Sequence, residues 1–171
     1  DRRVPAKVLM GGYKGNRYLG DNSNNPIVSI SAGGTHNMVL SAEGLVYSFG
    51  DNTYGQLGDS TNTTRLTPVK VLKGSHPGTR FLGDNKPIYA VAAGGRHSLI
   101  LSSSGMVYAF GYNYHGQLGD NNTAADKKIP VNVLKGAYSG KTYLGDDTSN
   151  KCISLITGYY HSAVQVENGS I

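Results

Sequence analysis

Short runs of alternating apolar and polar residues follow one another along the middle of the chain, and Gly-rich or Ser-rich turns separate them. Residues 88–92, 97–101 and 107–110 are rich in β-branched and aromatic side chains, which is typical of strands. A similar run at 69–72 precedes them, and a tight turn is expected at 103–105. The pattern therefore predicts four short strands in this stretch.

The same pattern occurs more than once. The run AGGTHNMVLSAEGLVYSFGDNTYGQLG at 32–58 returns as AGGRHSLILSSSGMVYAFGYNYHGQLG at 93–119, displaced by 61 positions. A partial third copy, TGYYHSAVQVENG, occupies 157–169. A fixed period of about 62 residues indicates stacked supersecondary units, and four strands per unit correspond to one blade. Residues 1–171 are therefore predicted to form one array of about 2.75 units, at approximately 1–66, 67–128 and 129–171, the last incomplete.

Composition supports strands and argues against several kinds of protein. The 24 glycines and 12 tyrosines favour turns and pleated surfaces over helices, so the predicted class is all-β. The net charge is +5, but the basic residues are scattered, so no nucleic-acid-binding stripe is expected. The single cysteine, Cys152, excludes an internal disulfide framework, and no apolar run is long enough for a membrane span.

Several residues recur at one place in successive units, and we predict structural roles for them. His36, His97 and His161 share a register, and a residue kept in every unit usually satisfies backbone groups within its blade. Glycines also recur where close backbone approach or positive φ is expected: Gly33, Gly34, Gly94, Gly95, Gly50, Gly111, Gly55 and Gly116. His76 and His115 lie outside the His register and are predicted to be surface residues.

No pattern predicts a catalytic, cofactor or metal site. In GAYSGKT at 136–142, three residues separate the glycines, where a phosphate-binding loop needs four. The LGDN or LGDD loops at Leu19, Leu82 and Leu144 could offer oxygens to calcium, but turn chemistry accounts for them better. No nucleophile and base pair is recognisable, so no enzymatic activity is expected.

The double glycine, the histidine, VYxFG and GQLG fall at matching positions in two complete copies. Together they resemble the repeat of the regulator-of-chromosome-condensation family, which implies a seven-bladed β-propeller with four-stranded blades. The inserts that carry YLGD or FLGD depart from the family's core. Fewer than three units cannot close such a ring, so we expect tandem propeller-type blades that are not self-closing. They would belong to a larger propeller or associate with other copies.

Three Asn-x-Ser/Thr sequons begin at Asn62, Asn121 and Asn168, and the first two lie in equivalent loops after GQLGD. Matched sequons in exposed loops favour a secreted protein that carries glycans. An extracellular location is therefore the first expectation, and a cytoplasmic or nuclear location is the alternative.

Two kinds of function fit these features. The first is a non-enzymatic structural or interaction protein that binds copies of itself, or further repeats, head to tail; an extracellular glycosylated filament or surface protein is one form of it. The alternative, which the resemblance implies, is a regulatory binding propeller that acts on a small GTPase or chromatin as a guanine-nucleotide exchange factor. Protein is the expected partner in both cases, and no cofactor is expected.

Overall fold

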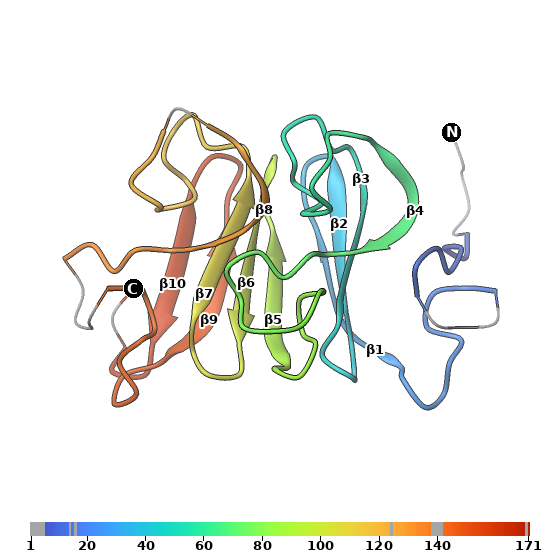
Figure 1. The fold of residues 1–171 in the computed structure, drawn as a ribbon, viewed down its shortest axis with the longest axis horizontal. Coiled ribbons are helices and arrows are strands. Elements are labelled where there is room, and N and C mark those ends of the chain that lie inside the picture. The colour runs from blue at the N-terminus through green and yellow to red at the C-terminus, as the bar shows by residue number, and fades with distance from the viewer. Residues whose placement is uncertain (1–5, 14, 16, 124, 138–141, 170) are drawn as a thin grey trace.

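The computed structural model describes every residue except 1–5, 14, 16, 124, 138–141 and 170. Its regular elements are all β-strands, so the predicted all-β class is confirmed. The described part of the chain contains no helix, and hence no helical segment that could cross a membrane. The strands form two four-stranded sheets and one two-stranded sheet, which lie side by side along the long axis (Figure 1).

Each complete sheet takes four consecutive strands in chain order, which is the arrangement of a propeller blade. Blade 1 contains β1 (Ile27–Ala32), β2 (His36–Ser41), β3 (Val46–Gly50) and β4 (Arg65–Lys70). Blade 2 contains β5 (Ile88–Ala93), β6 (His97–Ser102), β7 (Val107–Gly111) and β8 (Lys127–Asn132). The third sheet contains β9 (Cys152–Thr157) and β10 (Ser162–Val166).

The three inner strands of blade 2 begin at the predicted residues. The strand predicted at 69–72 begins four residues earlier and belongs to blade 1. The outer strand of blade 1, β4, spans Arg65–Lys70, and Pro68 lies within it. The outer strand pairs only with β3, and its register shifts between Ser48 and Gly50. A proline is tolerated there because an edge strand leaves one row of backbone groups unpaired. The apolar pattern carries little information about such a strand.

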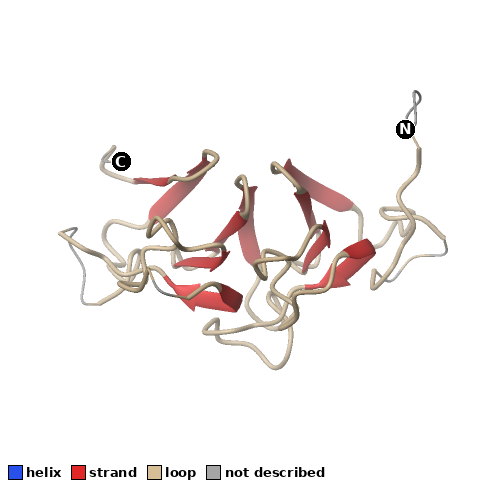
Figure 2. Ribbon diagram, turned by 90° about the horizontal axis from the view of Figure 1, so that it is seen from above, coloured by secondary structure: helices blue, strands red, loops and turns tan. Residues whose placement is uncertain are grey.

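Neighbouring blades pack face to face, and in the view from above they stand next to one another in a row (Figure 2). The core between blades 1 and 2 contains Met38 and Val71 on one side and Tyr108 and Phe110 of β7 on the other. The ring of Phe110 is fully buried. A Cβ at Gly58 would lie 2.8 Å from both Phe110 and Val71. Glycine at this position therefore makes room for the aromatic ring.

The double glycines lie in the turns between the first two strands of each blade, and they let the turns of neighbouring blades approach each other. The Gly34 N–H donates to the Gly94 carbonyl oxygen at 3.0 Å, and the Gly95 N–H donates to Gly158 O at 3.3 Å. A Cβ at Gly34 would lie 2.8 Å from Gly95 O. These glycines are thus required by close approach. The other recurring glycines adopt positive φ instead: Gly50 (115°), Gly111 (101°), Gly55 (79°) and Gly116 (74°).

The Phe110 contact predicts that alanine substitutions at two aromatic residues of blade 2 differ greatly in their effect on stability. We expect Phe110→Ala to lower the free energy of unfolding by about 3 to 5 kcal/mol, because a buried ring is replaced by a cavity. Tyr89→Ala is the matched control, since the Tyr89 side chain is 65% exposed and should change stability by no more than about 0.5 kcal/mol. Urea denaturation measures both, and equal losses would contradict the packing described.

Candidate functional site

Loops from three successive sheets bring aromatic side chains together at one end of the strands. The loops after β3 and β7, the β9–β10 turn and the β5–β6 turn all contribute. We call the resulting surface the aromatic face, and it consists of Tyr54, Arg96, Tyr112, Tyr114, His115, Tyr159 and Tyr160.

The rings of the aromatic face form one continuous series of contacts. Tyr54 lies 4.8 Å from Tyr112 between ring centroids, Tyr112 lies 5.9 Å from His115, and His115 lies 5.0 Å from Tyr160. Tyr159 extends the series at 4.5 Å from Tyr160. These pairs are edge-to-face, a favoured geometry for aromatic rings. The series therefore holds its rings in fixed relative positions across the blades.

Much of this ring surface is open to solvent. Tyr114 is 71% exposed, Tyr159 is 49% exposed and Tyr160 is 47% exposed. Burial and the neighbouring Tyr54 raise the pKa of Tyr112, so its hydroxyl is protonated at neutral pH. The face thus offers ring edges, ring faces and hydroxyl groups to the outside.

The charged groups of this region already have partners. The Arg96 guanidinium carbon lies 5.1 Å from the Tyr54 ring centroid, and Nη1 donates a hydrogen bond to the Tyr54 hydroxyl at 3.1 Å. Burial acts to raise the pKa of Asp51, but hydrogen bonds from Thr53 and Gln56 outweigh it and lower the pKa. Arg96 therefore fixes the ring of a neighbouring blade, and Asp51 stays ionised.

The aromatic face arises where the repeats differ. Tyr112 occupies the position of Asp51, Tyr114 that of Thr53, and Tyr160 that of Arg96. Residues shared by the repeats serve blade packing, so aromatic residues at non-shared positions need another explanation. The shared positions of the repeat do not reveal this surface, because its tyrosines lie where the repeats differ. The available signal was the gain of tyrosines in the second and third units.

The recurring histidines contact neighbouring blades. His36 Nε2 lies 2.8 Å from Ser98 Oγ, and that hydroxyl donates to Gln56 O at 2.8 Å. Because the serine proton is used by the carbonyl group, the histidine ring must donate through Nε2. His97 repeats the arrangement with Ser162 at 3.0 Å. The expected partners were backbone groups within the same blade, whereas the rings bond directly to a serine of the next blade.

Burial sets the protonation state of both rings. Desolvation, together with the nearby His97, lowers the pKa of His36 to about 4. Desolvation also lowers the pKa of His97 to about 4. Both histidines are therefore neutral at pH 7, with the ring proton on Nε2. The role of the histidine register in stability stays a prediction.

The remaining histidines occupy three different environments. His161 is exposed and lines a groove beside β10. His115 is exposed on the aromatic face. The surface prediction for His76 is wrong, since this side chain is 1% exposed and packs edge-on against Tyr108 at 5.2 Å. The insert that carries His76 folds onto blade 2. This contact cannot be predicted from the residues that the repeats share.

The acidic loops bind their own backbone. Asp84 accepts hydrogen bonds from the backbone N–H groups of Arg80 at 3.3 Å and Phe81 at 2.9 Å, and Asp21 does the same with Arg17 and Tyr18. This is ordinary turn chemistry. Among the described residues, no group of three or more His, Cys, Asp or Glu side chains is placed to hold a metal ion.

The three sequon asparagines lie at exposed positions. The side-chain amide of Asn62 donates to Thr53 O at 2.8 Å. Asn121 has a φ of 59° and corresponds in the repeat to Ser60, whose φ is 68°. The sequons at Asn62 and Asn121 therefore share a loop but not a position within it. The serine of the Asn168 sequon lies outside the described residues.

The buried histidines predict a pH-dependent stability. The folded-state pKa of about 4 for His97 lies below the ordinary histidine pKa of about 6.5, so protonation favours the unfolded state. The contribution is complete above about pH 6.5 and is lost as the pH falls towards 4. We expect His97→Ala to lower the free energy of unfolding by about 1 to 3 kcal/mol at neutral pH and by less near pH 5.

Urea denaturation at the two pH values measures this difference, and His115→Ala is the control with an exposed ring. A loss for His97→Ala that does not change with pH would contradict the role assigned to the neutral ring.

Comparison with known proteins agrees with the architecture. A model of the regulator of chromosome condensation (RCC1) repeat matches residues 43–101 and 104–165, and a second model of this repeat matches 27–56 and 88–117. The human probable E3 ubiquitin-protein ligase HERC4 is 34% identical over 145 residues, which are 85% of this chain and 12% of that protein.

Two crystal structures have similar folds. Human WBSCR16 gives a TM-score of 0.67 at 20% identity, over 90% of this chain and 35% of that one. Prp20p from Saccharomyces cerevisiae gives 0.63 at 21% identity, over 88% of this chain and 33% of that one. The chain thus spans about a third or less of the relatives it matches. With repeat models matching most of its length and blades of the corresponding topology, the chain belongs to the regulator of chromosome condensation (RCC1) repeat family.

Proposed function

We propose that this chain is a protein-binding segment of an RCC1-type propeller and that the aromatic face is its contact surface. The observation that carries the proposal is the continuous series of rings supplied by three sheets. Tyrosine and arginine are enriched among the residues that dominate binding energy at protein interfaces. Loops rich in Tyr, Asn, Gly and Ser also form antibody paratopes, in which tyrosine rings give contact area at low entropic cost.

The fixed geometry of the face favours binding. Arg96 holds Tyr54, and the rings of Tyr112, His115 and Tyr160 restrain one another. Side chains that are already ordered lose little conformational entropy when a partner binds. The face carries no paired nucleophile and base, so binding rather than catalysis is proposed.

Relatives support a protein partner. The yeast protein Prp20p has described binding properties to Gsp1p and histones, and another structure holds it bound to Kap60. For this chain we propose the same class of partner, a protein, and a regulatory binding role in place of a self-assembling filament. Histone binding by Prp20p also favours the nuclear alternative for its location. Guanine-nucleotide exchange is the second candidate function.

Several finer hypotheses stay predictions. Head-to-tail filament formation, glycans at the sequons and an extracellular location have no independent support from the relatives. Ligase activity is not proposed either, because the match to HERC4 covers 12% of that protein. The partner itself is a protein of unassigned identity.

Photo-crosslinking tests the proposed surface. A photoreactive phenylalanine analogue at position 114 or 160 should crosslink a protein partner in cells, whereas the same analogue at position 89 should not. Tyr89 is the matched control because it is a tyrosine with similar exposure, 65% against 71% for Tyr114. Tyr114→Ala with Tyr160→Ala should weaken binding of the crosslinked protein at least about tenfold.

Thermal unfolding of each variant controls for folding. Crosslinks that form equally well from all three positions, or only from position 89, would contradict the assignment of the aromatic face.

A further inference from the structure

Two cationic side chains lie against one aromatic ring at the end of the outer strand of blade 1. Lys70 Nζ, from the last residue of β4, lies 4.9 Å from the centroid of the Phe81 ring, and the Arg80 guanidinium carbon lies 5.1 Å from it. Contacts of this kind between a cation and a ring are attractive. We call Lys70, Arg80 and Phe81 the basic cluster.

The same arrangement occurs one repeat earlier. Lys7 Nζ lies 5.1 Å from the centroid of the Tyr18 ring, and the Arg17 guanidinium carbon lies 5.2 Å from it. Each of these residues precedes its counterpart in the basic cluster by 63 positions. Two successive units therefore place a lysine and an arginine on the same ring.

The third unit keeps the ring and loses both cations. Asn132 and Thr142 stand where the second unit has the lysine and the arginine, and Tyr143 keeps the aromatic position. Residues 70–86 contain four basic residues and one acidic residue, whereas the corresponding residues 132–148 contain two of each. The positive charge is thus a property of particular units and not of the repeat.

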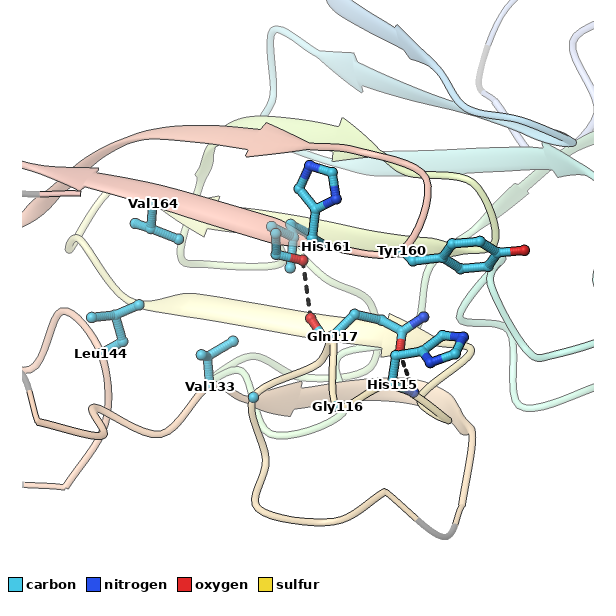
Figure 3. Close-up of a pocket in the computed structure, with 11 residues that line it drawn as sticks. His115, Gly116, Gln117, Val133, Leu144, Tyr160, His161 and Val164 are labelled. Atoms are coloured by element: carbon cyan, nitrogen blue, oxygen red, sulfur yellow. Dashed lines mark hydrogen bonds between the residues drawn. The ribbon is translucent and has the colours of Figure 1, made fainter.

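The described part of the third insert nevertheless folds in the same way. The Leu144 N–H donates to Val133 O at 2.9 Å, and Figure 3 shows the two side chains next to each other. In the second unit, the Leu82 N–H donates to Val71 O at the same distance, 2.9 Å. The cations are therefore not needed to fold the insert, so their presence in the other units is better explained by binding.

The basic cluster keeps a net positive charge. Among the described residues, no ion pair includes Lys70 or Arg80. Asp84 belongs to the same insert, and it accepts hydrogen bonds from Thr79 Oγ1 and from the Phe81 N–H, both at 2.9 Å. Burial acts to raise the pKa of Asp84, but these hydrogen bonds and, to a smaller extent, the charge of Lys70 lower it. One carboxylate therefore balances only one of the two cations.

A groove of about 460 Å³ lies beside the cluster, between the inserts of the first two units. Lys70 and Phe81 line it, and Val69 and Leu72 add apolar side chains. The groove therefore places an apolar surface directly beside the two cations.

The other charged residues of the groove neutralise each other. Arg65 Nη2 lies 2.7 Å from Asp59 Oδ2, and Arg65 Nε donates to the same oxygen at 2.8 Å. Both residues line the groove. Its net charge thus comes from the basic cluster, and a ligand that fits it must be anionic.

This combination favours an acidic peptide over nucleic acid. Single-stranded nucleic acid binds by stacking its bases on open aromatic rings, but two cations already contact the Phe81 ring. A duplex is bound by a series of cations along its phosphates, and the third unit has none at the matching positions. A peptide can supply both an apolar side chain for the groove and carboxylates, which pair well with guanidinium groups.

We propose that the basic cluster and the adjacent groove form a docking site for an extended acidic peptide of a partner protein. An apolar residue of the peptide enters the groove, and flanking aspartate or glutamate carboxylates pair with Lys70 and Arg80. The site shares no residue with the aromatic face and does not rest on the proposed function.

A fluorescent peptide tests the chemistry of the site. The probe has one leucine with several glutamates on each side, and fluorescence anisotropy measures its binding to the 171-residue chain. We expect saturable binding that weakens as the salt concentration rises. Replacing the glutamates by glutamines should lower the affinity at least about tenfold, and replacing the leucine by serine at least about threefold. The altered peptides leave the protein unchanged, so a folding defect cannot explain either loss.

Two protein variants with equal net charge test the location. Lys70→Gln combined with Arg80→Gln should weaken binding of the glutamate peptide at least about tenfold. Lys128→Gln combined with Lys151→Gln removes two cations outside the cluster and should leave the affinity within about twofold. Thermal unfolding checks that both variants fold, which the third insert predicts for the first.

Four results would overturn the proposal. One is no saturable binding of the glutamate peptide, and another is equal affinity for the glutamate, glutamine and serine peptides. The third is an equal loss in the two variants, which would reduce the effect to general attraction by a basic protein. The fourth is an oligonucleotide that displaces the peptide, binds more tightly and requires Lys70 and Arg80, which would make nucleic acid the ligand.

Discussion

The array depends on the contact between the third strand of one blade and the apolar groove of the blade before it. A thin antiparallel sheet has two apolar faces and can bury them only against neighbouring layers. Here the contact is made by Tyr108 and Phe110 of β7, which enter the core between blades 1 and 2. Gly58 makes this contact possible, because any side chain at that position would overlap the Phe110 ring. The GQLG segment of one blade and the VYxFG strand of the next blade are therefore two halves of one interface.

The other recurring residues stabilise the same interface at the turn between the first two strands of each blade. The paired glycines bring the backbones of adjacent blades within hydrogen-bonding distance. The neutral ring of His36 bonds to Ser98 of the next blade, and His97 bonds to Ser162 in the same way. Because packing accounts for the recurring residues, the non-recurring tyrosines of the aromatic face stand apart as candidates for binding. The split between recurring and non-recurring positions separates the structural residues from the proposed contact surface.

Much of this architecture can be predicted from the sequence, since inner strands carry alternation and their turns carry glycine. The outer strand β4 was misplaced, because an edge strand paired on one side imposes little pattern on its residues. Burial of His76 was missed because it depends on how an insert folds over blade 2. The serine partners of the histidines lie 62 and 65 residues away in sequence, so blade stacking must be known before they can be paired. The aromatic face requires the same knowledge, because its rings meet only after three sheets are aligned.

Native-state hydrogen exchange tests most directly whether contacts between blades hold the array together. Blade 2 is covered on both faces, whereas the third sheet is covered on one and lacks a strand beside β10 among the described residues. The account predicts that amide hydrogens of β6 and β7 exchange only through the largest unfolding reaction. Those of β10 should exchange through a smaller opening with a lower free energy. Equal opening free energies for β7 and β10 would contradict the account, because each blade's stability would then not depend on its neighbours.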